Sequence, residues 1–582
     1  MAVNSTDTGS VREPFAREKP RQMSNDTRYL CAAAYLDSGF RDHVMDELLS
    51  DPYRAVSPSY GDFDLMPVIH HCRRSRSMLI VRDVLITVIL LFGLVVSPLT
   101  TIQWVVMLVP FVLLTTGPVR NGPLIVKALI WIWAVWSAFG LFLTAIFQQS
   151  LLLLIGGLNE RYLTAFDFTE AVGAMLSMLF IPLVTLAVAL VYRIAVYLTL
   201  AGVLRPGAPA PEPGVTDPKT RARLDYVHRA QHGNITMYAN EDAFMGAGHI
   251  LLNWSIAVEL DRVREPEGPP SRRDTPVDID PMVLHAFVRN RLQEMRDHVL
   301  RPNEGIHRLD LGDHVVTKGL FTVSDWYGDG TGVAHPLIDP AGLPRYQAHP
   351  DEIAAIARHP QGGVRYYQRV TISNTGQEIR DLNGRLVAPA ADQEAITSAF
   401  IHLAVEGRML YTQFVVTVLP PVLPIYHVVD LLPAMNSRRI AWEAVRALKL
   451  RLLRDVLAAP VRAARTGVQA VRQGLTRPNP AKYVVYPYGA GFSVREFGAD
   501  DDLQTHIQRL DVRKYVRMIE QRLTESVLDF LEERGVETGA YRMQAANVTN
   551  QSMYVFGSTV SGPIAFGSHA SATVNNPPRP AS

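Results

Sequence analysis

Hydrophobic positions are concentrated between residues 78 and 200, and the chain elsewhere is ordinarily polar. No charged residue occurs from Val84 to Thr116. This run is too long for one membrane-spanning helix and long enough for two, because a bilayer core requires about 20 apolar residues of helix. The dipeptide Ser97-Pro98 marks the break between them. The pattern predicts a multi-pass α-helical membrane domain of about four helices, over about 78–97, 99–116, 123–147 and 171–191.

The clusters of basic residues beside the predicted spans all fall on one side, and on the other side Arg161 stands against Glu160, Asp167 and Glu170. The clusters precede the first span, separate the second from the third and follow the fourth: Arg73, Arg74, Arg76, Arg120, Lys127, Arg193 and Arg205. Because cytoplasmic loops carry an excess of Lys and Arg, four spans place both termini in the cytoplasm and the protein in the plasma membrane. The charged residues of the spans, such as Arg82 and Asp83, lie near span ends, so a membrane anchor is favoured over a transporter or pore.

The polar remainder divides into segments of different composition. Before the membrane domain (78–200), the N-terminal residues are polar and form no apolar pattern. After the last span, the chain is rich in proline. We predict a disordered N-terminus (1–25), a cytosolic helical segment (26–77), a Pro-rich linker (201–220), a cytosolic α+β domain (221–435), a basic amphipathic helix (436–478), a helical unit (479–540) and a tail (541–582).

Strand and helix signals alternate within residues 221–435. Residues 254–260 alternate apolar and polar positions, as a half-buried strand does. Two β-rich runs, 396–405 and 409–419, flank the turn Glu406-Gly407-Arg408 and predict a hairpin. The order of elements predicts an α+β domain with a mainly antiparallel sheet.

Residues 409–429 allow a second interpretation, because they contain no fully charged side chain and could form a fifth span. Three prolines, Pro420, Pro421 and Pro424, oppose a continuous helix. The β-branched residues before them favour a strand, and we predict one.

The segment 437–477 contains ten basic residues and two acids. Its apolar residues recur every four positions from Ile440 to Val456, so it is predicted to be an amphipathic helix, broken near Pro460. A basic amphipathic helix on the cytoplasmic side is expected to lie on the anionic leaflet. The residues expected to contact the membrane surface are Arg438, Arg439, Arg446, Lys449, Arg451 and Arg454. A solvated helix of the cytosolic domain is the alternative.

The C-terminal segments differ in character. Ser493 and Glu496 have the spacing of a capping box. From Met543 to Pro578 there is no charged residue, and YVFGSTVSGP (554–563) resembles the following IAFGSHASAT (564–573). We interpret this as a short β-rich repeat that mediates self-association or binding of a protein partner; a flexible tail is the alternative. The residues predicted to carry the association are Val555, Phe556, Val560, Ile564 and Phe566.

Candidate chemistry is sparse. The net charge of +1 gives no general attraction to nucleic acid, which is not expected as a partner. The motifs HExxH, CxxC and GxSxG are absent, and Gly246-Ala247-Gly248 precedes a strand where a dinucleotide site requires the reverse order. His314 with Asp313 or Asp325 would form a catalytic pair only beside a nucleophile. We predict no catalytic, cofactor-binding or metal-binding residue and no cofactor, and leave open whether the protein is an enzyme.

Several sequence stretches resemble a group of uncharacterised actinobacterial four-pass membrane proteins. They are YLCAAAYLD (29–37), AVSPSYG (55–61), YGAGFSVRE (488–496) and QRLDVRKY (508–515). The resemblance implies a membrane protein but no particular activity. The Asn-rich tail is also similar to the short prion-like motifs of bacterial immunity proteins.

Three functions remain open at this point. The one we favour is a membrane-anchored cytosolic interaction, scaffold or sensor protein, because no catalytic site is visible. A membrane-bound enzyme that uses a pocket within 221–435 is the first alternative. A small transporter or pore is the second.

Overall fold

The computed structural model describes residues 22–557 except 97, 115–118, 120–122, 138, 141–165, 212–213, 215–216, 264–275, 298–305, 307, 323–335, 377, 382, 449–450, 476–477 and 484. These residues form two compact units. The all-helical unit contains residues 22–41, 66–214 and 425–475. The α+β unit contains residues 42–65, 217–424 and 478–557.

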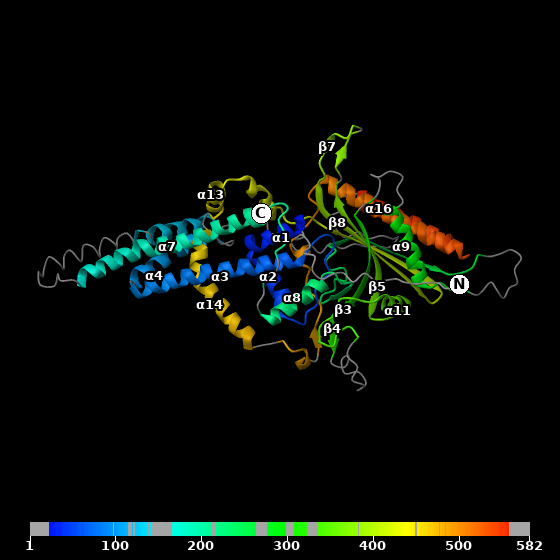
Figure 1. The fold of residues 1–582 in the computed structure, drawn as a ribbon, viewed down its shortest axis with the longest axis horizontal. Helices are drawn as coiled ribbons and strands as arrows, with labels where there is room; N and C mark the ends of the chain where they lie inside the picture. The colour runs from blue at the N-terminus through cyan, green and yellow to red at the C-terminus, as the bar shows by residue number, and fades with distance from the viewer. Residues whose placement is uncertain are drawn as a thin grey trace, which may run out of the picture. The chain divides into compact units, whose positions relative to one another are not determined.

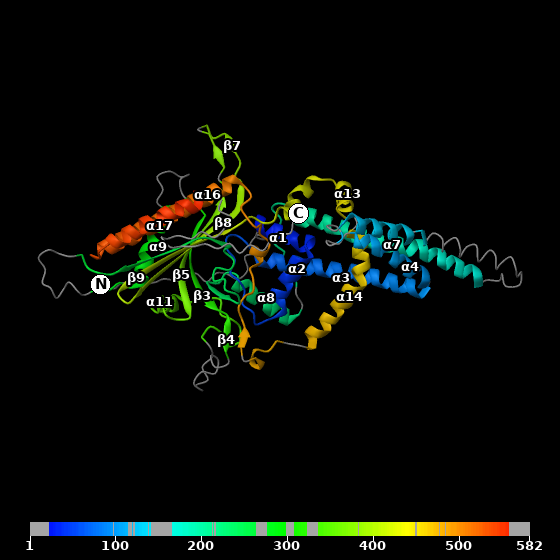
Figure 2. The same cartoon turned by 180° about the vertical axis from the view of Figure 1, so that it is seen from behind.

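Long apolar helices form the centre of the all-helical unit (Figures 1 and 2). Many of their apolar side chains face outward, including Phe92 and Val95 of α3, which are 63% and 83% exposed. The elements of the unit are α1 (Asn25–Leu36), α3 (Leu65–Val96), α4 (Pro98–Leu113), α7 (Phe166–Val203), η3 (Pro424–His427), α12 (Val428–Leu431), η4 (Leu432–Ala434), α13 (Ser437–Leu448) and α14 (Arg451–Leu475).

The prediction of about four membrane helices is wrong. Within the described residues, only two helices are long and apolar enough to cross a membrane, Leu65–Val96 and Phe180–Val203. Two further apolar helices, Thr101–Leu113 and Leu124–Ser137, are shorter. A helix rises about 1.5 Å per residue, so even the whole of α4 covers only about 24 Å, less than the hydrocarbon core of about 30 Å. For α4, the charge-free run in the sequence therefore overstated the length of the helix that forms.

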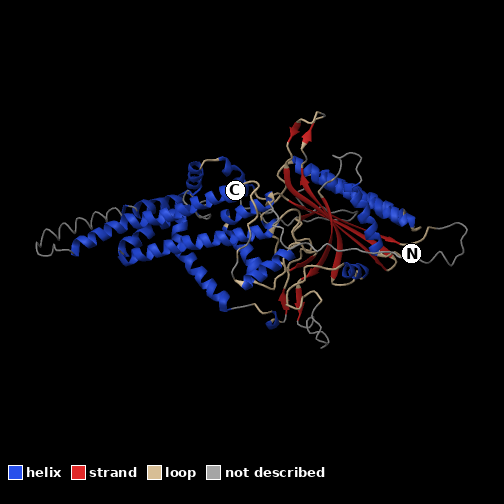
Figure 3. Cartoon of the chain, in the orientation of Figure 1, coloured by secondary structure: helices blue, strands red, loops and turns tan. Residues whose placement is uncertain are grey.

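The α+β unit is built on one large sheet (Figure 3). Its helical elements are α2 (Ser38–Met45), which begins before the unit, η1 (Asp46–Ser50), α8 (Pro218–Ala230), α9 (Pro281–Asp297), α11 (Pro350–Arg358), η5 (Pro480–Lys482), α15 (Val494–Phe497), α16 (His506–Glu533) and α17 (Gly539–Gly557). Its strands are β1 (Ile235–Tyr238), β2 (His249–Glu259), β3 (Leu309–Lys318), β4 (Leu320–Thr322), β5 (Val364–Thr375), β6 (Ile379–Arg380), β7 (Leu386–Ala388), β8 (Asp392–Glu406), β9 (Met409–Leu419) and β10 (Val485–Pro487).

The main sheet has six strands in the order β1-β3-β5-β8-β9-β2. It is a mixed sheet and not simply antiparallel, because β1 pairs with β3 in parallel. The other four pairings are antiparallel. The predicted hairpin is confirmed as β8–β9, joined at Glu406 and Met409. The prediction of a strand in place of a fifth span is confirmed for residues 409–419, which form β9 inside the sheet.

Helices α9, α16 and α17 cover one face of this sheet and form the main core with it. Alternate residues of β2, from Leu252 to Val258, point into that core, and Leu260 just after the strand joins them. Leu284 and Val288 of α9, and Val516 to Leu531 along α16, meet them at the helical spacing of three and four. The opposite face is covered in part by Tyr60, Phe244 and neighbouring residues.

Strand β2 lies at an edge of the sheet, and a side chain of α17 satisfies part of that edge. Gln544 donates through Nε2 to the Ala257 carbonyl over 3.0 Å and accepts from the Ala257 amide over 3.3 Å. Its carboxamide thus takes the place of one residue of a neighbouring strand. An edge closed in this way is less able to pair with another chain.

We expect Gln544→Leu to lower the free energy of unfolding of the α+β unit by about 1–2 kcal/mol, because it removes both bonds to a backbone group. Urea unfolding of the full chain, followed by the fluorescence of the buried Trp254, measures this loss. Met543→Leu on the exposed neighbouring position is the matched control. Equal stabilities of the two variants would contradict this role for Gln544.

The predicted β-rich tail is also wrong where the structure describes it. Residues 539–557 form helix α17, which includes Val555 and Phe556. The start of this helix buries Tyr541 and Ala545 against the core, and packing of this kind outweighs the β-propensity of a short segment. The other residues predicted to associate, Val560, Ile564 and Phe566, lie outside the described residues.

Candidate functional site

Helix α14 packs across the apolar helices of the all-helical unit (Figure 1). The buried side chains of Val456 and Ala459 join a cluster with residues of three other helices. These residues are Ile86 and Leu90 of α3, Trp104 and Leu108 of α4, and Ile181 and Ala189 of α7. The apolar face of α14 is therefore already occupied in its first half.

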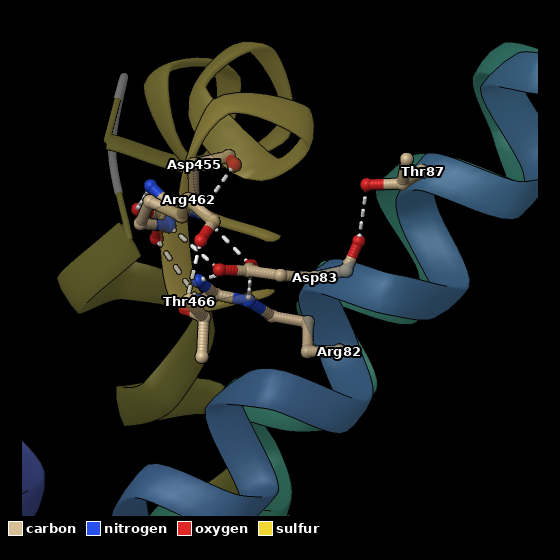
Figure 4. A network of polar contacts seen from close by, with 6 residues as sticks. All are labelled: Arg82, Asp83, Thr87, Asp455, Arg462 and Thr466. Carbon is tan, nitrogen blue, oxygen red and sulfur yellow. Dashed lines mark hydrogen bonds and ion pairs between the residues drawn. The ribbon is translucent and has the colours of Figure 1, made fainter. Parts of the chain in front are cut away.

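A buried group of charges fixes α14 to α3 (Figure 4). The Asp83 side chain is 2% exposed and receives two arginines. Arg462 of α14 donates to it through Nε over 2.7 Å and through Nη2 over 3.0 Å. Arg82 donates to Asp83 Oδ1 through Nε and Nη2 over 2.9 and 2.8 Å. Paired bonds of this type combine charge with a fixed geometry.

Asp455 and Tyr192 also contact the arginines of this group. Asp455 of α14 lies 3.6 Å from Arg82, and its carbonyl accepts from Arg462 over 2.7 Å. The guanidinium of Arg82 also stacks on Tyr192 of α7 at 4.5 Å. Two carboxylates thus face two guanidinium groups, as a low-dielectric site requires. The group ties α3, α7 and α14 together.

The second half of α14 presents a different surface. Val461, Val468 and Val471 are each more than 60% exposed. Arg465 and Arg472 are exposed on the same half of the helix. An exposed face that combines valines and arginines is typical of a helix in a membrane interface.

The six basic residues predicted to contact the membrane surface are divided between two helices. Arg438, Arg439 and Arg446 are exposed on α13, and Arg454 is exposed on α14. Arg451 begins α14, and Lys449 lies outside the described residues. The predicted break near Pro460 is wrong, because Pro460 lies within α14. Membrane contact of these residues stays a prediction.

A polar cleft of 740 Å³ lies on the α+β unit; most of its lining belongs to residues 221–435, where the sequence allowed an enzymatic pocket, and the rest to residues 59–62. Two ion pairs lie in its walls: Arg308 donates to Asp62 over 2.9 Å, and Arg369 donates to Asp310 over 2.7 Å. The lining residues are Ser59, Gly61, Asp62, His232, Gly233, Asn234, Arg308, Leu309, Asp310, Gly312, Asp313, Gln347, Arg369, Thr371 and Ser373.

The cleft follows the edge of β3. Strand β1 pairs only with residues 315–318, so among the described strands none lies beside the start of β3 on that side. Gly312 has no side chain, and a Cβ there would approach Arg369 Nη2 to 2.5 Å. The absence of a side chain at Gly312 thus leaves room for the Arg369 side chain, whose guanidinium lies 5.1 Å from the centre of the Tyr60 ring. The cleft offers fixed donors and acceptors to a polar ligand.

His314 and Asp313 do not form a catalytic pair. They are adjacent on β3 and thus point to opposite faces of the sheet. His314 donates through Nε2 to the Ala243 carbonyl over 3.1 Å, which leaves Nδ1 to accept from the Tyr60 hydroxyl over 3.2 Å. Burial lowers the pKa of His314 to about 3 and raises the pKa of Tyr60 to about 12. Both groups are neutral at physiological pH and stabilise the covered face of the sheet. Asp325 lies outside the described residues.

Metal ligands do not cluster in the described part of the chain, where no group of three or more His, Cys, Asp or Glu side chains could hold an ion. Comparison with known families is more informative. The sequence model of the AbeC-like domain matches residues 253–562, more than half of the chain. The chain belongs to the AbeC-like domain family.

The AbeC-like domain extends from β2 to the region of α17 and includes both α13 and α14. It does not include α3 or α7, so the match bears neither on the number of membrane passes nor on the source organism. No curated protein matches the chain, and no solved structure matches it.

Proposed function

We propose that this AbeC-like protein is a membrane-anchored interaction protein. In this proposal α3 and α7 cross the bilayer, α14 lies along its cytoplasmic surface, and the α+β unit binds a polar ligand or partner. The observation that carries it is the attachment of α14 to α3 by Asp83 and Arg462. An amphipathic basic helix held against two apolar helices suits the level at which a membrane meets water.

The contacts between α3 and α7 support a topology in which the start of α3 and the end of α7 lie on the same side of the membrane. Arg82 contacts Tyr192, and Gly93 lies next to Ile181, so the two helices run antiparallel. The basic residues then meet at one end, because Arg73, Arg74 and Arg76 precede the apolar part of α3, Arg193 lies in the last third of α7, and Arg205 follows that helix. The excess of positive charge favours the cytoplasm for that end.

Fusion and extraction experiments test this proposal. We expect green fluorescent protein to be fluorescent at either terminus, because it folds poorly after export in the unfolded form. Alkaline phosphatase inserted between α3 and α4, after Val96, is expected to be active outside. The intact chain should stay in the membrane pellet after alkaline carbonate extraction. Release of the chain by carbonate would contradict the membrane anchor.

A membrane-bound enzyme is the second candidate function, and the polar cleft is the observation in its favour. Asp62, Asp310 and Asp313 each bond an arginine, however. These ion pairs place charged groups of both signs at fixed positions in and beside the cleft, as recognition of a polar ligand requires. The cleft therefore supports ligand binding.

A further inference from the structure

A crevice in the all-helical unit is lined almost entirely by apolar side chains and encloses 290 Å³. Its walls come from the consecutive helices α3 and α4 and from α14, which lies far from them in the sequence. Its polar members are two threonines, and Thr87 donates its hydroxyl to the Asp83 carbonyl over 2.6 Å. The lining residues are Thr87, Leu90, Leu91, Leu94, Thr101, Ile102, Trp104, Val105, Val106, Leu108, Val456, Leu457 and Pro460.

A second hollow begins where this crevice ends. The two share Pro460, and the second follows the surface of α14 along Val461, Ala464 and Val468. Arg465 and Arg472 stand in its lining and are exposed. An apolar slot thus continues into a groove that carries positive charge.

The charges beside the crevice have different roles. Arg82 and Arg462 are held by Asp83 and Asp455, which neutralise them. Arg465 and Arg472 lie one and three turns farther along α14, in the groove lining. Both residues are exposed, so an anionic group in this groove would lie beside their positive charges.

We propose that the crevice and the groove together bind one anionic phospholipid. Its acyl chain occupies the crevice between α3, α4 and α14, and its phosphate lies in the groove near Arg465 and Arg472. An acyl chain suits the apolar lining, which offers almost no hydrogen-bonding group, and the two arginines suit an anionic phosphate headgroup. This inference rests on the proposed membrane anchor and adds a specific lipid site to it.

Quenching of Trp104 tests the proposal, because this side chain lines the crevice. The full chain is purified in mild detergent with Trp131, Trp133, Trp136 and Trp442 replaced by Phe. It is titrated with phosphatidylglycerol or phosphatidylcholine that carries brominated acyl chains. We expect half-maximal quenching at a concentration about 10-fold or more lower for phosphatidylglycerol, since each basic residue near a lipid surface contributes roughly five-fold.

Matched variants identify the two parts of the site. Arg465→Gln with Arg472→Gln should abolish the preference for phosphatidylglycerol and leave quenching by phosphatidylcholine unchanged. Arg438→Gln with Arg439→Gln removes the same charge from α13, outside the linings of the crevice and the groove, and should preserve the preference in detergent, where no lipid leaflet is present. Val105→Phe narrows the crevice and should weaken quenching by both lipids.

Two outcomes would overturn the lipid site. One is equal quenching by the two lipids, and the other is the same loss of preference in the α13 control, which would indicate general attraction to charge. Either result leaves the membrane anchor intact if carbonate still fails to extract the chain. Extraction by carbonate, in contrast, would remove the anchor and the lipid site together.

Discussion

Replacement of Asp83 by alanine is expected to destabilise the all-helical unit by about 3–5 kcal/mol, because it leaves the buried guanidinium of Arg82 and the partly buried guanidinium of Arg462 without their shared carboxylate. The Arg82 side chain is 5% exposed, so water cannot readily replace the lost partner. Arg462 would lose two of its bonds and with them the attachment of α14 to α3. We expect a lower midpoint of thermal unfolding in detergent and faster tryptic cleavage within α14.

Asp455→Ala is the matched control for this change. It removes the other carboxylate of the group, which is 37% exposed and 3.6 Å from Arg82. We expect a loss below about 1 kcal/mol, as for other partly exposed ion pairs. The double variant Asp83→Ala with Arg462→Ala should recover part of the stability, since it removes one uncompensated cation. A loss no larger for Asp83→Ala than for Asp455→Ala would show that the group does not hold α14.

The sequence indicated the secondary structure well wherever local periodicity and burial agree. The β8–β9 hairpin follows from two β-rich runs around Glu406-Gly407-Arg408, and the structure pairs the same residues. The alternation along β2 likewise matches its burial. The parallel pairing of β1 with β3 could not be predicted, because more than 70 residues separate Ile235 from Val315 and no local pattern records the contact.

The prediction of the apolar helices failed for a different reason. Hydropathy measures how many apolar residues follow one another and not where a helix ends. The charge-free run after Ser97-Pro98 forms a helix that ends at Leu113, with Pro110 inside it. The charge-free run thus contains more residues than the helix that forms within it.

The sites were visible in the sequence only in part. The basic amphipathic segment was recognised, but its link to Asp83 was not, because 379 residues separate Asp83 from Arg462. Arg82 and Asp83 looked like residues at the end of a span. The polar cleft could not be predicted either, since its walls come from five separate stretches of chain and contain no contiguous motif.

Glu496 shows how a local motif can be misinterpreted. The spacing from Ser493 suggested a capping box, but Ser493 makes no capping bond. Glu496 Oε1 instead accepts from the backbone amides of Gly246 and Gly248 over 2.8 and 2.7 Å. Both glycines have positive φ values, 97° and 90°, which let the loop present its amides to the carboxyl group.

Burial raises the pKa of Glu496 to about 7, and nearby Asp242 adds to the effect, although the two amide bonds and Arg495 oppose it. Below pH 4.5 the carboxyl group is protonated in both the folded and the unfolded chain. As the pH rises toward 7, the unfolded chain loses this proton and the folded chain keeps it. The α+β unit is therefore destabilised progressively over this range, by about 3 kcal/mol in full above pH 7.

Glu496→Gln is accordingly expected to stabilise the α+β unit by about 3 kcal/mol at pH 8 and to change it little near pH 4.5. Glutamine retains the acceptor for both amides and never ionises, so the gain should grow between these values. Urea unfolding of the full chain followed by Trp254 fluorescence provides the comparison, and pH effects of other groups, such as His314, cancel between variant and wild type. Glu378→Gln is the control, because Glu378 pairs with Arg380 at the surface and its pKa is lowered by that bond. A gain at pH 8 no larger for Glu496→Gln than for this control would show that the buried carboxyl group does not destabilise the fold.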